Sequence, residues 1–311
     1  MQLEILEQLS ESQFVLEHIA ANQPCVIKDI SFDADNWTTS AFKERVGDLT
    51  TQVYDTLFEL QDIATMGSYL ERYFEQAREP GQAAPYVRWY NRLKDVEFPW
   101  GDEAFERLNS CWTLPDCIPR TELLVPLARH GRQANPVFDL FPYRGVLVAA
   151  QGARTRLHRD PFCSDAIVNQ FAGVKEYLLY HPDRTNELRQ GQDASSFGGF
   201  LDVRDPTSAE PKIEPDFRGL VNPGELLYIP HGWLHDVLVV EDSISITWNF
   251  VHQAGSAKFR QYLLDGPESD PEFEVLKYFY AHAGTEVRTV QDVLAHLDAV
   301  ASVDSPLARS A

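Results

Sequence analysis

Residues 155–160 read Thr155-Arg156-Leu157-His158-Arg159-Asp160, and residues 230–235 read Pro230-His231-Gly232-Trp233-Leu234-His235. Side chains two residues apart in a β-strand point to the same face, so His158 and Asp160 can direct an imidazole and a carboxylate to one point. A second histidine from a distant strand, His235, would complete a set of two histidines and one carboxylate. This set leaves coordination positions open, as oxygen-activating non-haem Fe(II) requires. The two stretches therefore predict a metal site on a β-scaffold.

Turn and strand signals surround the two stretches. Residues 169–182 read as a strand, a turn marked by Gly173, and a second strand that opens on Lys175. Residues 222–230 form a Pro-Gly turn followed by an apolar strand, and residues 243–250 alternate as a further strand. Short strands separated by Gly and Pro turns are what an all-β barrel requires.

The sequence resembles the JmjC and cupin-like Fe(II)/2-oxoglutarate oxygenases, in particular the small hydroxylases related to the asparaginyl hydroxylase of the hypoxia pathway. The shared motifs are T-x-x-H-x-D, G-x-K after a short strand, P-G-[DE]-x-L-x-I-P-x-x-W-x-H, and a closing strand with its N-F, within residues 145–251. The resemblance implies a mainly β protein. Its core would be a double-stranded β-helix of the cupin, jelly-roll or JmjC type, with N-terminal α/β elements and C-terminal helices. It also implies Fe(II), 2-oxoglutarate and O2 as cofactor and cosubstrates.

The resemblance assigns roles to individual residues. His158, Asp160 and His235 would be the metal ligands and the catalytic set. Lys175 would form a salt bridge to the distal carboxylate of 2-oxoglutarate, and Thr155 would donate a hydrogen bond to the same carboxylate. A solvent-facing turn lysine is the alternative for Lys175. Strict alternation puts Thr155 on the face opposite His158, so the backbone between them must be irregular if both side chains face inward.

The last predicted strand has one polar and one apolar face. Its polar positions are Ser245, Thr247 and Asn249, and its apolar positions are Ile244, Ile246, Trp248 and Phe250. A barrel that holds iron and a dicarboxylate needs polar groups inside, while helices can cover its apolar outer face, so Asn249 is expected near the cofactor. The same parity makes Tyr177 an inward neighbour of Lys175. By resemblance, Tyr86 and Arg88 match the upstream aromatic-x-polar strand that reaches cosubstrate and substrate in these hydroxylases.

Two further positions bear on the chemistry. His231 lies four residues before His235, a zinc-type spacing on a helix, but the flanking proline and glycine argue against a helix there. Ala166 stands where relatives often carry an asparagine near the cosubstrate, which leaves room for a different substrate. The acidic Asp160 argues against a halogenase, in which a small residue replaces the carboxylate to admit chloride.

Composition indicates a folded, acidic protein. Of its 311 residues, 44% are hydrophobic and 12% aromatic, as in a globular chain with a large core. The net charge of −20, from 47 acidic and 27 basic residues, disfavours nucleic acid and is compatible with a basic peptide partner. No apolar run predicts a membrane span, and the N-terminus lacks a basic signal-peptide region. Four cysteines without close pairing predict reduced thiols and a cytoplasmic protein.

The patterns divide the chain into three parts: N-terminal α/β decoration over residues 1–140, the core barrel over 141–254, and C-terminal helices over 255–311. The first part is expected to hold helices near residues 12–21, 39–46 and 66–77, and strands near 25–27, 50–54 and 86–90. Polar residues 183–216 interrupt the barrel and are expected to form a substrate lid.

The C-terminal part carries apolar residues at helical spacing. These positions are Leu276, Phe279, Tyr280, Val293, Leu294 and Leu297. An amphipathic helical hairpin must bury its apolar face, which favours a homodimer through these helices. Packing back on the barrel of the same chain is the alternative.

The residues and the resemblance together predict an Fe(II)/2-oxoglutarate-dependent dioxygenase. We expect it to hydroxylate an unactivated C–H on an amino-acid side chain in a peptide or protein. N-methyl-lysine demethylation and hydroxylation of a natural-product intermediate are alternatives within the class. A metal- or sugar-binding cupin without oxygen chemistry is the alternative from another class. Lys175 and Asn249 distinguish it, because a dicarboxylate cosubstrate explains both residues.

Overall fold

The computed structural model describes residues 2–7, 9–28, 32–76, 84–90, 101–125, 144–190, 199–205, 213–266, 271–282 and 286–303. The strands are β1 (Glu4–Leu6), β2 (Cys25–Ile27), β3 (Thr50–Tyr54), β4 (Leu60–Thr65), β5 (Tyr86–Tyr90), β6 (Leu123–Val125), β7 (Arg144–Ala149), β8 (Arg154–Arg159), β9 (Asp165–Ala172), β10 (Lys175–Tyr180), β11 (Phe217–Val221), β12 (Leu226–Ile229), β13 (Leu234–Val239) and β14 (Ser243–His252). The helices are α1 (Glu11–Gln13), α2 (Thr39–Val46), α3 (Met66–Tyr73), α4 (Asp102–Leu108), α5 (Thr185–Leu188), α6 (Ser256–Asp265), α7 (Pro271–His282) and α8 (Val290–Val303). A π-helical stretch (Phe14–Ile19) continues α1.

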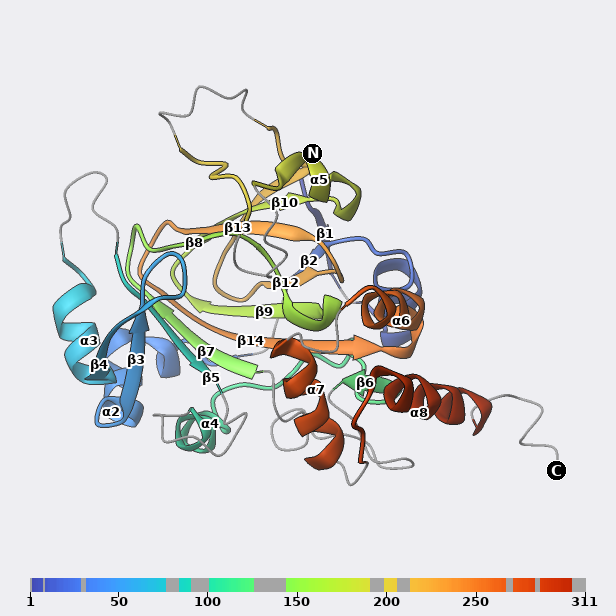
Figure 1. Ribbon diagram of the computed structural model, residues 1–311. Coiled ribbons are helices and arrows are strands. Elements are labelled where there is room, and N and C mark those ends of the chain that lie inside the picture. Colours follow the sequence, from blue (N-terminus) through green and yellow to red (C-terminus); the bar gives the residue numbers. More distant parts are fainter. Residues whose placement is uncertain are drawn as a thin grey trace.

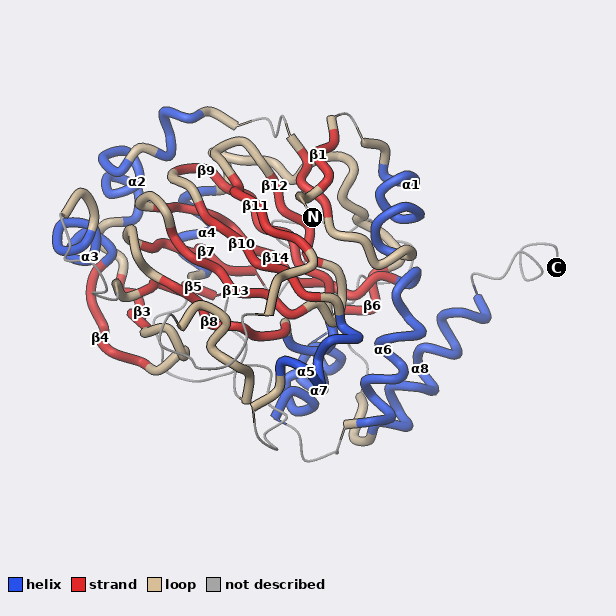
Figure 2. Tube along the Cα trace, turned by 90° about the horizontal axis from the view of Figure 1, so that it is seen from above, coloured by secondary structure: helices blue, strands red, loops and turns tan. Residues whose placement is uncertain are grey.

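Two β-sheets lie over one another and form the centre of the molecule, with β8, β10 and β13 above β5, β7, β9 and β14 in the view of Figure 1. Seen from above, α2 and α3 lie at one end of the strands, and α6 and α8 lie at the other (Figure 2). The cavity described below is lined from both sheets, as in a jelly roll.

The larger sheet joins N-terminal strands to the barrel. Its ten strands follow the order β1-β2-β12-β9-β14-β7-β5-β3-β4, with β6 paired to β14. All residues of β14 are buried, and it pairs antiparallel with both β9 and β7. Ile244, Ile246 and Phe250 pack in the principal core with Phe14 and Trp37 of the N-terminal part. N-terminal elements thus cover the apolar face of β14, as the alternating pattern of this strand predicts. The polar face of β14 points to the interior, between the two sheets.

Side-chain caps start the N-terminal helices. The Ser10 hydroxyl accepts a hydrogen bond from the Gln13 backbone at 3.3 Å and the Gln13 side chain accepts one from the Ser10 backbone at 3.3 Å, which is a capping box. The predicted helices and strands of this part are present, with two corrections. The first helix is π-helical from Phe14 and ends at Ile19, two residues before the predicted end. The third helix ends at Tyr73 and does not reach residue 77, because Phe74 adopts an extended backbone (φ −81°, ψ 148°) that directs its side chain into the core.

The smaller sheet has four antiparallel strands in the order β11-β10-β13-β8. Its outer face packs Leu157, Leu178 and Leu234 against Phe200. Asp236, also on the outer face, is fully buried and accepts hydrogen bonds from two arginines.

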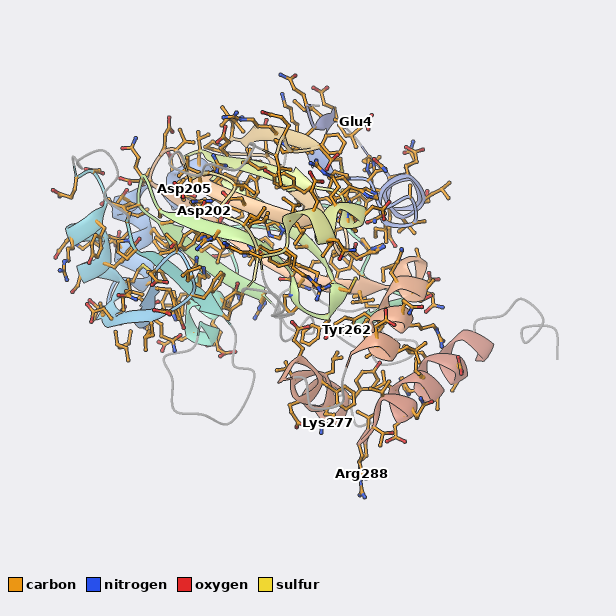
Figure 3. All side chains as sticks on the ribbon, turned by 45° about the horizontal axis from the view of Figure 1, so that its top comes forward. Glu4, Asp202, Asp205, Tyr262, Lys277 and Arg288 are labelled. Atoms are coloured by element: carbon orange, nitrogen blue, oxygen red, sulfur yellow. The ribbon has the colours of Figure 1, made fainter. Side chains whose placement is uncertain are left out.

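The two arginines around Asp236 connect distant parts of the chain. Arg154 of β8 donates through Nη2 at 2.6 Å, and Arg204 donates through Nε at 2.6 Å. Arg154 also pairs with Asp202 at 2.7 Å, and Figure 3 shows Asp202 beside the strands, far from the C-terminal helices. Residues 199–205 therefore pack on the outside of the smaller sheet. The predicted lid stays a prediction, and its segments 191–198 and 206–212 lie outside the described residues.

The C-terminal helices are confirmed, and their apolar faces are buried within one chain. Leu276, Tyr280, Val293 and Leu297 pack in a second cluster together with α6 and the end of β14. Figure 3 labels Tyr262 on α6 and Lys277 on α7, on this side of the molecule. The side chain of Phe279 lies outside the described residues. The other predicted apolar positions pack within this chain and so do not require a second chain to cover them, and the dimer stays a prediction.

The division of the chain at residues 140 and 254 also stays a prediction. The strands β2, β3 and β5 of its first part belong to the same sheet as β7, β9 and β14.

Among the described residues, no helix combines the length and the hydrophobicity that crossing a membrane demands.

Candidate metal centre and cosubstrate pocket

Two histidines and one aspartate converge between the sheets. His158 of β8 and His235 of β13 are directly opposite one another in the strand register, and their ring centroids lie 4.1 Å apart. Asp160 follows β8, and its Oδ2 lies 3.9 Å from His235 Nε2. The three potential ligand atoms all lie within 4.8 Å of one another. This spacing is compatible with a single ion bound by all three side chains.

Backbone carbonyls fix the tautomer of both histidines. His158 Nδ1 lies 2.8 Å from the carbonyl oxygen of Arg156, and His235 Nδ1 lies 3.3 Å from that of Trp233. A carbonyl only accepts, so each Nδ1 donates its hydrogen and each Nε2 keeps its lone pair for a metal. Burial, together with the neighbouring His235, holds the pKa of His158 well below its usual value, which favours the neutral ligand form.

Asp160 is held by a neighbour on β14. Burial raises the pKa of this carboxyl, while His235 and a hydrogen bond from Asn249 act in the opposite direction. Asn249 Nδ2 also lies 3.2 Å from the Ser164 hydroxyl, just beyond the turn that follows Asp160. Asn249 therefore lies beside the potential metal ligands, and its hydrogen bond orients the Asp160 carboxylate.

A β-bulge resolves the parity conflict between Thr155 and His158. His235 pairs with His158 and Val237 pairs with Thr155, so the single residue Asp236 stands opposite two residues of β8. Such a bulge shifts the alternation by one residue and returns the next side chain to the first face. Thr155 and His158 consequently both line the cavity. The irregular backbone that the sequence requires is present at residues 156–157.

The cavity extends from the metal ligands into the space between the sheets. Its lining residues are Phe58, Tyr86, Arg88, Tyr90, Leu147, Thr155, His158, Asp160, Val168, Tyr177, Ile229, His235, Val237, Thr247 and Asn249. The structure thus brings together the predicted site residues Thr155, Asn249, Tyr86 and Tyr177 with the three potential ligands. Lys175 differs, because it is fully buried and is not among the lining residues.

Lys175 lies behind the wall of the cavity. Its Nζ donates to the Ser245 hydroxyl at 2.7 Å and lies 5.4 Å from the centre of the Tyr86 ring. Burial, with a further contribution from Arg88, lowers the pKa of Lys175 to about 7. Among the residues that the structure describes, no carboxylate is within ion-pair distance of it. The surface-turn alternative is wrong, since the side chain is 0% exposed.

Burying an ammonium group without a counterion costs free energy, so the buried Lys175 indicates that an anionic ligand binds nearby. The three potential ligands would supply two imidazole nitrogens and one carboxylate oxygen, which suits a divalent ion and leaves positions for other ligands. The residues present therefore fit both Fe(II) and a dicarboxylate.

The other histidines have different environments. His231 lies against the fully buried Asp165, with 3.1 Å between Nδ1 and Oδ1, and so stabilises the turn before β13. His181 accepts a hydrogen bond from the Asp183 backbone. Neither belongs to the group of potential ligands. Ala166 is buried beside Asn249 in the strand register, on β9.

Phe58 is one of the pocket residues that the sequence did not indicate. It lies in the turn between β3 and β4 with a left-handed backbone (φ 64°), and its ring centre is 6.0 Å from that of His158. A lone aromatic residue in a polar turn carries no local signal for a role in a pocket. The position of Phe58 depends on the antiparallel pairing of β3 with β5, which places the turn next to the cavity.

Comparisons with known proteins agree with this geometry. The model of a family described as a cupin-like domain matches residues 11–256. A 2-oxoglutarate and iron-dependent oxygenase, JMJD4 of Gallus gallus, is 23% identical over 280 residues, which cover 84% of this chain and 62% of that protein. The arginine-specific demethylase JMJ20 of Arabidopsis thaliana is 23% identical over 267 residues, 79% of this chain and 56% of that protein. Human JMJD4 is 28% identical over 133 residues, 40% of this chain and 31% of that protein.

The matched regions span less than two thirds of each of these relatives. The family match, together with the two facing sheets, confirms the predicted cupin-type fold class. The relatives are named a 2-oxoglutarate and iron-dependent oxygenase and an arginine-specific demethylase, and these names agree with the predicted oxygenase class and with the predicted Fe(II) and 2-oxoglutarate.

Proposed function

Because the chain belongs to the cupin-like family of JmjC-type 2-oxoglutarate oxygenases, we propose that it hydroxylates an unactivated C–H of an amino-acid side chain in a peptide or protein. One observation carries the proposal. Two histidine Nε2 atoms and a carboxylate converge at one end of a cavity, and its wall hides a lysine that has no carboxylate partner among the described residues. A cupin that only bound a metal or a sugar would have no use for that buried cation.

His158, Asp160 and His235 would hold the iron. Fe(II), when bound with O2 and 2-oxoglutarate, supplies the oxidation that couples decarboxylation of the keto acid to succinate and CO2 with oxidation of the substrate C–H. The contribution of the protein is geometric. The carbonyl oxygens of Arg156 and Trp233 keep both imidazoles in the ligand tautomer.

The opposite end of the cavity would hold the distal carboxylate of 2-oxoglutarate. Lys175 would provide the charge, and Thr155 would donate from its hydroxyl. Tyr86 and Tyr177 are buried and line the cavity, and a pocket closed to water would strengthen the electrostatic attraction between a buried cation and the carboxylate.

A peptide or protein substrate is supported by charge. The chain carries a net charge of −20, which attracts basic segments and repels nucleic acid. N-methyl demethylation is the second candidate, because one relative is named an arginine-specific demethylase. Hydroxylation of an N-methyl group gives an unstable product that releases formaldehyde, whereas hydroxylation of a side-chain carbon leaves a stable oxygen. Mass spectrometry of the product and an assay for formaldehyde separate the two.

The assignment of the metal ligands is tested with Asp160→Ala. We expect this variant to lose metal binding in a titration with Mn(II) and to lose succinate formation, while its circular dichroism stays that of the parent. Asp183→Ala removes an exposed carboxylate and is the matched control. An Asp160→Ala variant that consumes 2-oxoglutarate at the parent rate would contradict the assignment.

A further inference from the structure

Arg88 is a second buried cation in the cavity. It lies in the middle of β5, is 2% exposed, and lines the cavity directly. Its Nη2 donates to the Thr155 hydroxyl at 2.9 Å, and its Nη1 donates to the carbonyl oxygen of Asp55 at 3.1 Å. Both acceptors are uncharged. Within the described parts of the chain, the guanidinium has no carboxylate partner.

The carboxylate of Asp55 is engaged elsewhere. Its Oδ1 accepts from the backbone N–H groups of Leu57 and Glu59 at 2.8 and 3.0 Å, so it stabilises the turn between β3 and β4. This side chain therefore does not neutralise Arg88 by direct pairing. The guanidinium is the charged group that the cavity presents at this end.

Aromatic rings hold the guanidinium in place. Its Cζ lies 3.6 Å from the centre of the Phe58 ring and 4.4 Å from that of Tyr86. Such contacts offset part of the cost of burying a cation, but they do not supply a counterion. The rings also restrict the side chain to a position beside the cavity.

Arg88 and Lys175 lie around the same part of the cavity. Both cations lie close to the Tyr86 ring. Arg88 is also in one register row with Leu147 and Ser245 across β5, β7 and β14, and Ser245 accepts from Lys175. Two buried positive charges side by side repel each other, so an anion that binds near both would stabilise the arrangement.

We infer that Arg88 and Lys175 together bind the distal carboxylate of 2-oxoglutarate, with Arg88 at the cavity surface and Lys175 behind Ser245. The inference rests on the proposed function. A carboxylate has two oxygen atoms, and two cations approaching from different strands can serve one each. The Thr155 hydroxyl accepts from Arg88, so its own hydrogen is free for the same carboxylate. Arg88 thereby determines the specificity for a dicarboxylic keto acid.

The test compares two keto acids that differ only at the distal carboxylate. Binding of 2-oxoglutarate and of 2-oxopentanoate to the full chain loaded with Mn(II) is measured by isothermal calorimetry, without turnover. In Arg88→Gln we expect the Kd of 2-oxoglutarate to rise about thirtyfold or more, because one buried charge partner of the carboxylate is lost. The Kd of 2-oxopentanoate should change less than about threefold. Arg88→Lys should restore part of the difference between the two acids.

A second variant addresses the same point if Arg88→Gln does not fold. Lys175→Met removes the other cation and leaves Arg88 in place. This variant should still bind 2-oxoglutarate at least about fivefold more tightly than 2-oxopentanoate, since Arg88 alone still attracts the distal carboxylate. Equal affinity for the two acids in Lys175→Met would overturn the inference.

Two other results would also overturn it. One is an unchanged Kd of 2-oxoglutarate in Arg88→Gln, with loss of turnover only when a peptide substrate is present, because Arg88 would then face the substrate. The other is an equal loss of affinity for both keto acids, which would assign Arg88 a role in shaping the cavity. If the parent protein binds neither Mn(II) nor 2-oxoglutarate, the proposed function itself fails, and this outcome is distinct from the first two.

Discussion

Replacing Lys175 by methionine should make the ligand-free protein more stable while it weakens the binding of 2-oxoglutarate. The lysine is fully buried, and burial together with Arg88 lowers its pKa from 10.5 to about 7. At low pH this difference corresponds to a cost on the order of 4 to 5 kcal/mol for the folded state. Methionine fills a similar volume without a charge. The substitution also removes the hydrogen bond to Ser245, which lowers the expected gain in stability by about 1 kcal/mol. We therefore expect a net gain of roughly 3 kcal/mol below neutral pH.

The stability difference between Lys175→Met and the parent should depend on pH. The unfolded chain keeps the lysine proton up to its ordinary pKa of 10.5, whereas the folded chain releases it near 7. Between these values the unfolded state binds more protons, so the wild-type protein gains stability as the pH rises. The advantage of Lys175→Met is therefore largest near about pH 6 and should shrink by about 2 to 3 kcal/mol near about pH 9.

Urea unfolding with a chelator present and 2-oxoglutarate absent measures this effect. Arg88 and Tyr86 are the titratable groups against Lys175, and their pKa values of about 10 and about 12 keep both largely unchanged over this range. Lys258→Met, at an exposed lysine of α6, is the control and should show no such trend. Equal stability of Lys175→Met and the parent at low pH, or a gap independent of pH, would refute the reasoning.

Three further predictions concern the surroundings of the site. The Glu272 side chain of α7 accepts from the Phe162 backbone at 2.9 Å, in the turn after Asp160, so Glu272→Gln should weaken Mn(II) binding about three- to tenfold in a metal titration; unchanged affinity would remove α7 from the support of the site. Asp236→Ala leaves two half-buried arginines without the buried carboxylate they share, and urea unfolding should show a loss of about 3 kcal/mol while the Kd of 2-oxoglutarate stays unchanged. If α7 and α8 form a dimer, light scattering of the full chain at micromolar concentration should give twice the mass of one chain, and the mass of a single chain would contradict it.

The parts of the site that the sequence predicted depend on local periodicity. His158 and Asp160 lie on one strand and its end, so their relation follows from alternation with a period of two. The same period separates the two faces of β14, which is why Asn249 could be predicted to point inward. His235 required more, because its pairing with His158 is set by the register of β13 and β8. The ordered motifs of the family supplied that link.

The parts that the sequence could not predict depend on tertiary structure. The bulge at residues 156–157 has no glycine or proline to mark it, although the positions of Thr155 and His158 required some irregularity. The approach of Phe58 depends on the turn between β3 and β4. A sequence pattern also does not reveal that Arg88 has no carboxylate partner in the described part of the chain, since this depends on where the Asp55 carboxylate turns.

Stability and function oppose each other inside this barrel. Apolar clusters on the outer sides of both sheets supply the packing, with Ile246 in one and Leu157 in another. The space between the sheets instead carries two cations that destabilise the ligand-free fold. A ligand that binds only the folded state raises its stability in proportion to the logarithm of its concentration, so 2-oxoglutarate should stabilise the parent more than Lys175→Met or Arg88→Gln. On the proposed cosubstrate site, Lys175, whose replacement should stabilise the free protein, is also a residue that binds the cosubstrate. An apolar interior would remove both the cost in stability and the specificity for a dicarboxylate.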